Sequence, residues 1–285
     1  YKRQMHEYLD RFKKALKDLY IRPNDILYIA SDISLFLYYT NKNLGVRTVE
    51  QRNIFLNNLI DILQKAVGNK GTLLFPIFTW RFCKGEKFDY KNTKGETGTF
   101  SNWILENRPD FIRTKHPIYS FMVWGNDAVY LRNLNNKDSW SDDSPFAYLH
   151  QKNAKLLLLN VSLQRSFTFM HYVEEKIRVP YRYMKEFVGS YVDESGLEEQ
   201  RKYSMYVRDL QIESHEYLPE TFLTDKEVSV QIKFEKMNMR SIELAKAYKL
   251  IEDDLLNKGG ENCYKFHNYK INWMNGATHH DQISD

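Results

Sequence analysis

Three features are scarce in this chain: cysteine, long apolar runs and an excess of charge of one sign. Its 285 residues include only two cysteines, Cys83 and Cys263, which are too few for a disulfide scaffold and typical of a reducing compartment. Neither cysteine stands beside a histidine or in a CxxC pair. We therefore expect each to be a small, buried hydrophobic side chain rather than a nucleophile.

The apolar runs are too short for a membrane span. The longest purely aliphatic run extends from Leu156 to Leu159, whereas a spanning helix needs about 20 apolar residues. The stretch from Tyr1 to His6 is charged and lacks the apolar core of a signal peptide. The sequence thus predicts a cytoplasmic protein without a membrane span.

The charges nearly balance. There are 41 basic and 37 acidic side chains, which leave a net charge of only +4. A nucleic-acid-binding protein usually concentrates basic residues on one face, so we expect no nucleic-acid partner. A mildly basic surface suits a small anionic ligand, among many other partners. The sequence leaves the oligomeric state open, and a homodimer is compatible with it.

Hydrophobic periodicity predicts a layered α/β domain. The length allows one domain or two, but no linker or repeat interrupts the chain. Short buried strands are predicted at residues 26–30, 72–75, 119–124 and 155–161. Helices are predicted at residues 5–19, 54–67, 100–107, 168–177 and 241–256.

The segments between these elements are expected to be loops or peripheral strands. A polar loop is predicted to begin at Ser31-Asp32, and a long loop covers residues 81–98. Beyond Phe187, alternating charged and aromatic residues indicate strands of an antiparallel or peripheral sheet. We expect one domain over residues 1–258 and a C-terminal extension of unknown role over residues 259–285.

His171 and Glu174 are the first candidate for chemistry. Their spacing of three places both side chains on one face of the predicted helix. A carboxylate that orients an imidazole makes it a better general base near neutral pH. The same spacing also describes an ordinary surface pair. A zinc site is disfavoured, because neither an HExxH motif nor a cysteine cluster is present.

Three further segments have both a structural and a functional interpretation. His116-Pro117 precedes a strand and is typical of a turn with a solvated imidazole. Residues 76–80 form either an aromatic plug after a strand or the wall of an acyl pocket. Ser144-Pro145-Phe146 opens a helix, whose free backbone N–H groups can bind an anion.

Taken in order, five segments resemble the aminoglycoside 3-N-acetyltransferase family. The family's motifs are a first strand with a serine-containing loop, G-T-L-x-x-P-T-F-T, R-S-x-H-P-T-H-S followed by W-G, D-S-P-F with a strand after it, and T-x-x-H-x-x-E. The corresponding segments here are Asp25 to Ser34, Gly71 to Trp80, Arg113 to Ser120 with Trp124-Gly125, Asp143 to Phe146 with Leu156 to Leu159, and Thr168 to Glu174. The resemblance covers about residues 20 to 180 and implies a single layered α/β/α domain with a central mixed sheet and flanking helices.

The resemblance also implies a mechanism. His171 corresponds to the family's general base, and Glu174 orients it. The substrate amine then attacks the thioester of acetyl-coenzyme A directly, without an acyl-enzyme. Thr168, Thr79 and Ser120 are the hydroxyls expected to stabilise the oxyanion. No metal is implied.

The remaining site residues follow by the same correspondence. Residues expected to bind acetyl-coenzyme A are Ser31, Ile33, Ser34, Phe78, Thr79, Ser120, Ser144 and Phe146. Those expected to contact the acceptor are His116, Tyr119 and Arg178.

The chain departs from the family pattern at three places. The family's second histidine is Tyr119 here, the asparagine before the T-x-x-H threonine is Phe167, and nothing after Phe187 matches. Because the later segment is rich in Lys, Tyr and Arg, it does not predict the acidic cleft expected for polycationic aminoglycosides. It favours an amino sugar, either free or nucleotide-linked as in surface-polysaccharide synthesis. Arg178, Arg182 and Lys185 then face either a negatively charged acceptor or solvent.

Other functions stay open on the sequence alone. The alternative acceptor is an aminoglycoside antibiotic, which implies drug resistance. A non-catalytic, acyl-coenzyme A-binding homologue is a rival of a different class, although the retained His171 and Glu174 oppose it. A metal-dependent hydrolase needs carboxylate and histidine clusters that the sequence does not show.

Overall fold

A computed structural model describes residues 2–212, 214–216 and 218–276. Its centre is a seven-stranded mixed sheet. The strands are β1 (Ile26–Ser31), β2 (Thr72–Pro76), β4 (Ile112–Arg113), β5 (Phe121–Gly125), β6 (Lys155–Leu159), β10 (Ser229–Phe234) and β11 (Met237–Glu243). They lie in the order β10-β11-β6-β1-β2-β5-β4. Strand β1 is parallel to β2 and β6, and the other pairs are antiparallel.

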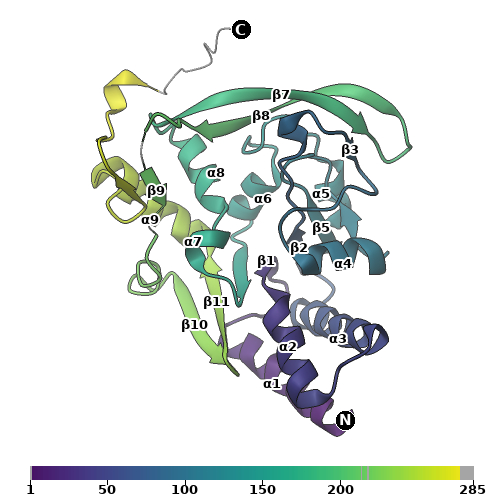
Figure 1. Cartoon of the computed structure of the whole chain (residues 1–285). Coiled ribbons are helices and arrows are strands. Elements are labelled where there is room, and N and C mark those ends of the chain that lie inside the picture. The colour runs from purple at the N-terminus through teal and green to yellow at the C-terminus, as the bar shows by residue number, and fades with distance from the viewer. Residues whose placement is uncertain (1, 213, 217, 277–285) are drawn as a thin grey trace.

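Helices cover both faces of this sheet (Figure 1). They are α1 (Lys2–Asp18), α2 (Ile33–Leu44), α3 (Val49–Val67), α4 (Thr99–Asn107), α5 (Ala128–Asn133), α6 (Pro145–Gln151), α7 (Leu163–Ser166), α8 (Phe169–Lys176) and α9 (Leu244–Asn257), with short 3-10 turns η1 (Phe82–Lys84) and η2 (Trp273–Asn275). The predicted layered α/β fold with a central mixed sheet is confirmed. Within the described residues, no helix is long and apolar enough to cross a membrane.

The buried strands are apolar on both sides because each side faces a different core. Side chains alternate across a strand, so Leu27 and Ile29 pack with α1 to α4, while Tyr28 and Ala30 pack with α6, α8 and α9. Strand β6 divides its leucines between the same two cores. This arrangement explains why these strands read as continuous apolar runs.

Two smaller sheets lie beside the main one. A long hairpin of β7 (Arg182–Val192) and β8 (Glu198–Arg208) pairs with β3 (Phe88–Asp89) and arches over the domain (Figure 1). Strand β9 (Ser214–Glu216) pairs with β12 (Tyr264–Phe266). Part of the predicted C-terminal extension is thus paired with the rest of the chain, while residues 277–285 of that extension lie outside the described residues.

The structure corrects two expectations and refines a third. The polar loop predicted from Ser31-Asp32 is wrong, because the Asp32 side chain accepts a hydrogen bond from the Ser34 N–H (3.0 Å) and starts α2, whose Phe36 is buried. The final helix starts at Leu244 rather than 241, because residues up to Glu243 continue β11. The strands predicted beyond Phe187 do pair antiparallel, as β7 does with β8, but β11 belongs to the central sheet, since it pairs with β6.

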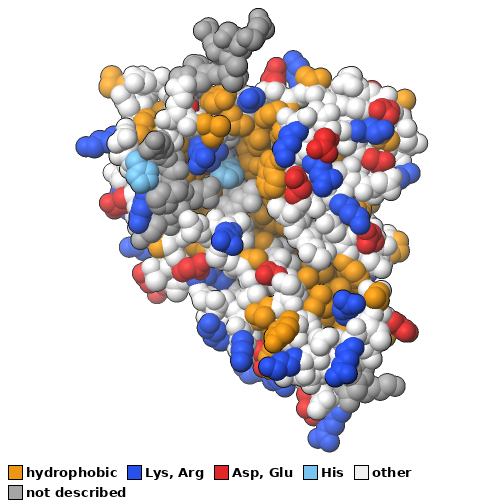
Figure 2. All heavy atoms as spheres, in the orientation of Figure 1, with side chains coloured by type: hydrophobic (Ala, Val, Ile, Leu, Met, Phe, Trp, Pro, Cys, Tyr) orange, Lys and Arg blue, Asp and Glu red, His pale blue; other side chains and the backbone are white. Residues whose placement is uncertain are grey.

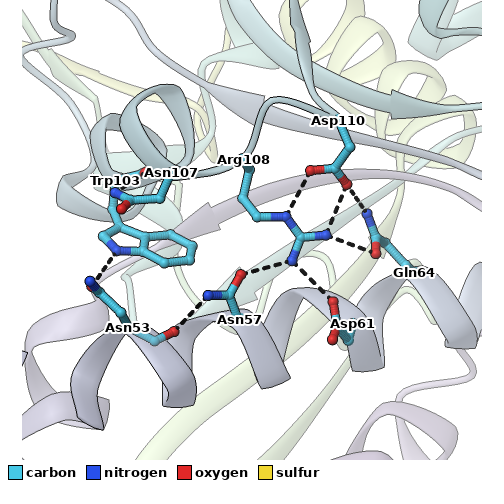
Figure 3. A network of polar contacts seen from close by, with 8 residues as sticks. All are labelled: Asn53, Asn57, Asp61, Gln64, Trp103, Asn107, Arg108 and Asp110. Atoms are coloured by element: carbon cyan, nitrogen blue, oxygen red, sulfur yellow. Dashed lines mark hydrogen bonds and ion pairs between the residues drawn. The ribbon is translucent and has the colours of Figure 1, made fainter. Parts of the chain in front are cut away.

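Arg108 fastens α4 to α3 on one face of the sheet (Figure 3). Its guanidinium donates to both carboxylate oxygens of Asp110 (2.8 Å each) and pairs with Asp61 at 3.0 Å. It also donates to the amide oxygens of Asn57 and Gln64, each at 3.1 Å. The planar guanidinium donates to four side chains at once, which a lysine in its place cannot match.

We expect the substitution R108A to lower the free energy of unfolding by about 2 kcal/mol, because it removes several charge-assisted hydrogen bonds from a largely buried side chain. Urea denaturation provides the measurement. The control is R52A, which removes an exposed arginine from α3 and is expected to change stability by less than about 0.5 kcal/mol. Equal effects of the two substitutions would contradict the fastening role of Arg108.

Candidate active site

The candidate site lies at one edge of the central sheet. The parallel strands β1, β2 and β6 all end there, at Ser31, Pro76 and Leu159. In α/β sheets this carboxyl edge is where ligands commonly bind. Strand β5 runs antiparallel to β2 and begins at the same edge, since Pro76 pairs with Phe121. Segments far apart in the sequence therefore meet at one place.

Helix α8 brings His171 and Glu174 to this edge. The two residues lie one helical turn apart, and the imidazole Nδ1 is 2.8 Å from the carboxylate Oε2 of Glu174. The Glu174 side chain is fully buried, whereas 22% of the His171 side chain is exposed. The dyad is thus a buried carboxylate that holds a solvent-accessible imidazole.

Glu174 has more partners than a surface pair has. Its Oε1 accepts hydrogen bonds from the hydroxyls of Tyr181 (2.9 Å) and Tyr264 (2.6 Å). Its Oε2 lies 2.8 Å from Nε of Arg182, which is buried as well. Burial by itself raises the pKa of Glu174, but the charge of Arg182 and the hydrogen bonds from His171 and Tyr264 outweigh it and hold the pKa at about 2. Glu174 is therefore a carboxylate at neutral pH.

An ionised Glu174 determines which nitrogen of His171 carries the proton. A carboxylate only accepts hydrogen bonds, so this contact assigns the proton to Nδ1 and leaves the lone pair on Nε2. Arg182 Nη2 lies 3.0 Å from the same Nδ1 and 3.1 Å from the Tyr264 hydroxyl, to which it donates. In this tautomer Nδ1 cannot accept a hydrogen bond from Arg182, so Arg182 acts on the imidazole only through its positive charge.

Trp140 packs beside the dyad. Its ring is fully buried and lies edge to face with His171, with 5.8 Å between the ring centroids. Its own backbone N–H donates to the carboxylate of Asp138 (3.1 Å), in a loop that bridges to Ser204 of the hairpin. Burial, together with the carboxylate of Asp138, raises the pKa of Glu175 to about 8. Helix α8 thus carries two adjacent glutamates in different states near neutral pH: Glu174 is ionised and Glu175 is protonated.

Several predicted hydroxyls are already engaged within the protein. Thr79 is buried and donates to the carboxylate of Glu96 (2.9 Å). The buried Ser120 hydroxyl accepts from Arg113 Nε (3.1 Å) and donates to the carbonyl of Ile77 (3.2 Å). Thr168, directly before α8, hydrogen-bonds the buried Tyr28. Of these three hydroxyls, only Thr168 lies on the same segment as the dyad.

His116 is buried, not solvated as a simple turn would leave it. Its Nδ1 accepts from the backbone N–H groups of Ile118 (3.3 Å) and Tyr119 (3.2 Å), and Nε2 faces Ser139 at 3.5 Å. Burial and the nearby charge of Lys137 lower the pKa of His116 to about 3. His116 is therefore neutral and orders the turn before β5.

The predicted aromatic residues pack together in one layer, and the predicted serine of α6 caps that helix. The rings of Phe78 and Phe146 are buried and pack on Tyr119, whose hydroxyl accepts from Trp80 Nε1 at 3.3 Å. The Ser144 hydroxyl accepts from the backbone of α6 and caps that helix. These side chains converge on the carboxyl edge of the sheet, one aromatic layer from Trp140.

The loop after β1 lies at the same edge. Ser31 ends the strand, Ile33 packs into the core and Ser34 starts α2. Arg178 lies beyond the end of α8, with its guanidinium 5.7 Å from the centroid of the Tyr206 ring. Below the hairpin, Figure 2 shows hydrophobic side chains lining a hollow between α8 and β3.

Sequence reasoning missed the residues that enclose Glu174. Tyr181 and Tyr264 carry no motif, and Arg182 was considered only for the acceptor, whereas the structure buries it against Glu174. Tyr264 comes from β12, ninety positions after its partner. No local pattern indicates such a contact. Within the described residues, no three side chains of His, Cys, Asp or Glu group together as metal ligands do.

This geometry is suited to removing a proton from a nucleophile. The Nδ1 proton of His171 is held by an ionised carboxylate, and this tautomer leaves the basic lone pair on Nε2. The fold belongs to the layered α/β class, and the site holds an imidazole against an ionised carboxylate, which is the arrangement that general-base chemistry uses.

Comparisons with known proteins identify the family. The model of the family described as aminoglycoside 3-N-acetyltransferase matches residues 44–255, more than half of the chain. The chain therefore belongs to this family and is an N-acetyltransferase. A comparison with curated protein sequences finds no match.

Solved structures share the fold. The aminoglycoside acetyltransferase AAC(3)-Xa is 18% identical with a TM-score of 0.67, and the comparison covers 89% of this chain and 98% of that one. AAC-IIIb in binary complex with CoASH is 16% identical with a TM-score of 0.70, and covers 89% and 97%. AAC-VIa bound to sisomicin is 18% identical with a TM-score of 0.67, and covers 88% and 97%.

We expect E174Q to lower the free energy of unfolding by about 3–5 kcal/mol near pH 7, because it leaves Arg182 buried without a counter-charge. The pKa of Glu174 is lowered from 4.5 to about 2 in the folded protein, so its ionised form stabilises the fold fully above pH 4.5. This contribution is lost as the pH falls toward 2. The difference between wild type and E174Q should therefore shrink over that window in urea titrations. The exposed E106Q variant is the control, and a pH-independent difference would refute the ionised pair.

Glu175 should show the opposite pH dependence. Its pKa is raised from 4.5 to about 8. The protonated form therefore contributes its full stabilisation below pH 4.5, and this stabilisation is lost as the pH rises toward 8. E175Q mimics the protonated form and should lose less stability than wild type between pH 5 and 8. Parallel urea titrations at pH 5, 6.5 and 8 measure this, and identical slopes would show that Glu175 is ionised in the fold.

Proposed function

We propose that the chain transfers the acetyl group of acetyl-coenzyme A to an amino group of an aminoglycoside. The His171–Glu174 dyad is the observation that carries this proposal, since an amine must lose its proton before it attacks a thioester. The family description names this reaction, and AAC-IIIb in complex with CoASH supports coenzyme A as the acyl carrier. Such a reaction would make the protein an antibiotic-resistance enzyme.

The proposed steps need no acyl-enzyme. His171 Nε2 takes a proton from the acceptor's ammonium group, and the freed lone pair attacks the thioester carbonyl carbon. A C–N bond forms and the C–S bond breaks, which releases the coenzyme A thiolate. The imidazolium then returns its proton to that sulfur, and the newly acylated nitrogen releases its second proton to solvent, which leaves the neutral amide. Throughout, Glu174 stays a carboxylate, because the charge of Arg182 and the two tyrosine hydroxyls stabilise it.

The oxyanion and the cofactor arm are assigned by position. Thr79, Ser120 and Thr168 all hydrogen-bond within the protein, but only Thr168 lies on the segment of the dyad. We assign the developing oxyanion to Thr168, whose hydroxyl would exchange its hydrogen bond with Tyr28 for one to the oxyanion. The apolar hollow beside α8 fits the weakly polar arm of coenzyme A, with Phe78 and Phe146 in the layer behind it. The Ser31–Ser34 segment and the start of α6 border the same edge.

A nucleotide-linked amino sugar is the second candidate acceptor. On the face shown in Figure 2, acidic side chains stand beside basic ones and do not gather in the hollow. The net charge of +4 also gives no general attraction for a polycation. AAC-VIa bound to sisomicin supports the aminoglycoside, whereas this distribution of charge favours an uncharged or anionic acceptor.

The test is thiol release from acetyl-coenzyme A with a panel of aminoglycosides and nucleotide-linked amino sugars. We expect H171A to lower kcat/KM by about 10²–10⁴, the range typical of a general base. The matched control is H6A, which removes an exposed histidine from α1 and should leave the rate unchanged.

The pattern of acceptors decides between the candidates. Release with aminoglycosides alone would support resistance, and release with nucleotide-linked sugars alone would support the second candidate. Release that H171A leaves unchanged would refute the mechanism. Binding of acetyl-coenzyme A without release from any acceptor would indicate a non-catalytic homologue.

A further inference from the structure

A second cavity lies away from the dyad, beneath the far half of the β7–β8 hairpin. It has a volume of about 570 Å³ and is bordered by the hairpin and by the segments around residues 90, 115 and 135–137. We call it the hairpin cavity, and its principal lining residues are Lys115, Lys137, Tyr191, Arg201, Tyr203 and Ser204. Its volume lies within the range of about 300–1,000 Å³ typical of small-molecule sites.

Four basic and four acidic side chains line the hairpin cavity, and every basic one except Lys137 has an ion-pair partner among the acidic ones. Arg201 pairs with Glu199 at 2.5 Å, and Lys115 lies 3.7 Å from Glu194. Lys137 makes no ion pair in the described part of the chain, and its closest polar contact is the amide oxygen of Asn135 at 3.3 Å. The cavity therefore presents one cationic group without a counter-charge.

Two cations are held in place by aromatic rings. The Lys137 ammonium lies 4.7 Å from the centroid of the Tyr203 ring, and the Arg201 guanidinium lies 4.1 Å from that of Tyr191. Burial lowers the pKa of Lys137, and the positive charges of Arg201 and Lys115 lower it further, while the carboxylate of Glu199 opposes them. These cations repel one another where they are, and an anion placed among them relieves that repulsion.

Tyr203 adds a donor that the protein itself does not use. The residue is only 1% exposed, and its hydroxyl makes no hydrogen bond of ordinary geometry with any described residue. Buried hydroxyls nearly always have a partner, so one that borders a cavity is available to a ligand oxygen.

The hairpin cavity adjoins the dyad without including it. Ser204 lines the cavity, and two residues further along β8 the carbonyl of Tyr206 accepts a hydrogen bond from Arg182 at 3.3 Å. That separation is about 7 Å along a strand. The Tyr203 ring also packs edge to face on His116, with 5.0 Å between centroids.

We infer that the hairpin cavity binds a phosphate-bearing ligand, with Lys115, Lys137 and Arg201 around the phosphate oxygens and the Tyr203 hydroxyl donating to one of them. The carboxylates that line the cavity pair with its other cations and leave Lys137 to select the anion. The inference goes beyond the proposed function and holds whichever acceptor is correct. The phosphate can belong to a nucleotide-linked acceptor or to a separate phosphorylated molecule.

Calorimetric titration with inorganic pyrophosphate and with uridine diphosphate tests the inference directly. We expect both to bind wild type, K137Q to weaken binding at least tenfold, and Y203F to weaken it several-fold while keeping the ring packing. The matched control is K233Q, an exposed lysine on β10, which should bind as wild type does. Absence of binding, or equal affinities of K137Q and K233Q, would overturn the inference.

Steady-state kinetics of K137Q identify the source of the phosphate. A higher KM for acetyl-coenzyme A alone would assign the cavity to the phosphates of the coenzyme and overturn the inference. A higher KM for a nucleotide-linked amino sugar assigns the cavity to the acceptor, whereas Lys137-dependent binding with unchanged KM values assigns it to a separate ligand. Both outcomes support the cavity. Lys137-dependent binding without thiol release from any acceptor contradicts the proposed function alone. Thiol release by a wild type that does not bind pyrophosphate or uridine diphosphate contradicts the cavity alone.

Discussion

The buried pair of Glu174 and Arg182 is the interaction on which the site depends. Two opposite charges in an apolar interior are tolerated only when hydrogen bonds satisfy what remains of each group. Here the hydroxyls of Tyr181 and Tyr264 donate hydrogen bonds to the Glu174 carboxylate, and the Arg182 guanidinium donates one to the carbonyl of Tyr206. The pair thereby ties α8 to the hairpin and to β12. The same contacts that join these elements hold the carboxylate against the imidazole of His171.

The hairpin of β7 and β8 links two chemically different places. At its base, Arg182 enters the dyad, and toward its tip Arg201 and Tyr203 line a charged cavity. The loop that carries Asp138 and Trp140 pairs with β8 between them. A displacement of the hairpin would therefore shift residues at both the dyad and the hairpin cavity, because closely packed elements transmit displacements.

Membership of the family determines which reaction the protein catalyses more firmly than it determines which acceptor the protein uses. The dyad needs only an amine and a thioester, so it accommodates many acceptors, and a shared fold does not imply a shared substrate. What selects the acceptor is the surface around the hollow, and the second half of the chain supplies much of it. In this half, basic and acidic side chains pair with one another, as Lys202 does with Glu186, instead of forming one acidic surface.

The sequence by itself determined the layers, most element positions and the dyad, because apolar periodicity, caps and an i,i+3 spacing are local properties. Strands β1, β2, β5 and β6 and the proximity of His171 to Glu174 could be predicted in this way, whereas the two-residue strands β3 and β4 could not. Only the tertiary structure decided that α2 replaces a loop, that Thr79 and Ser120 are engaged internally, and that Tyr264 reaches Glu174. Those outcomes depend on partners distant in the chain, and no local pattern records which buried polar groups will meet.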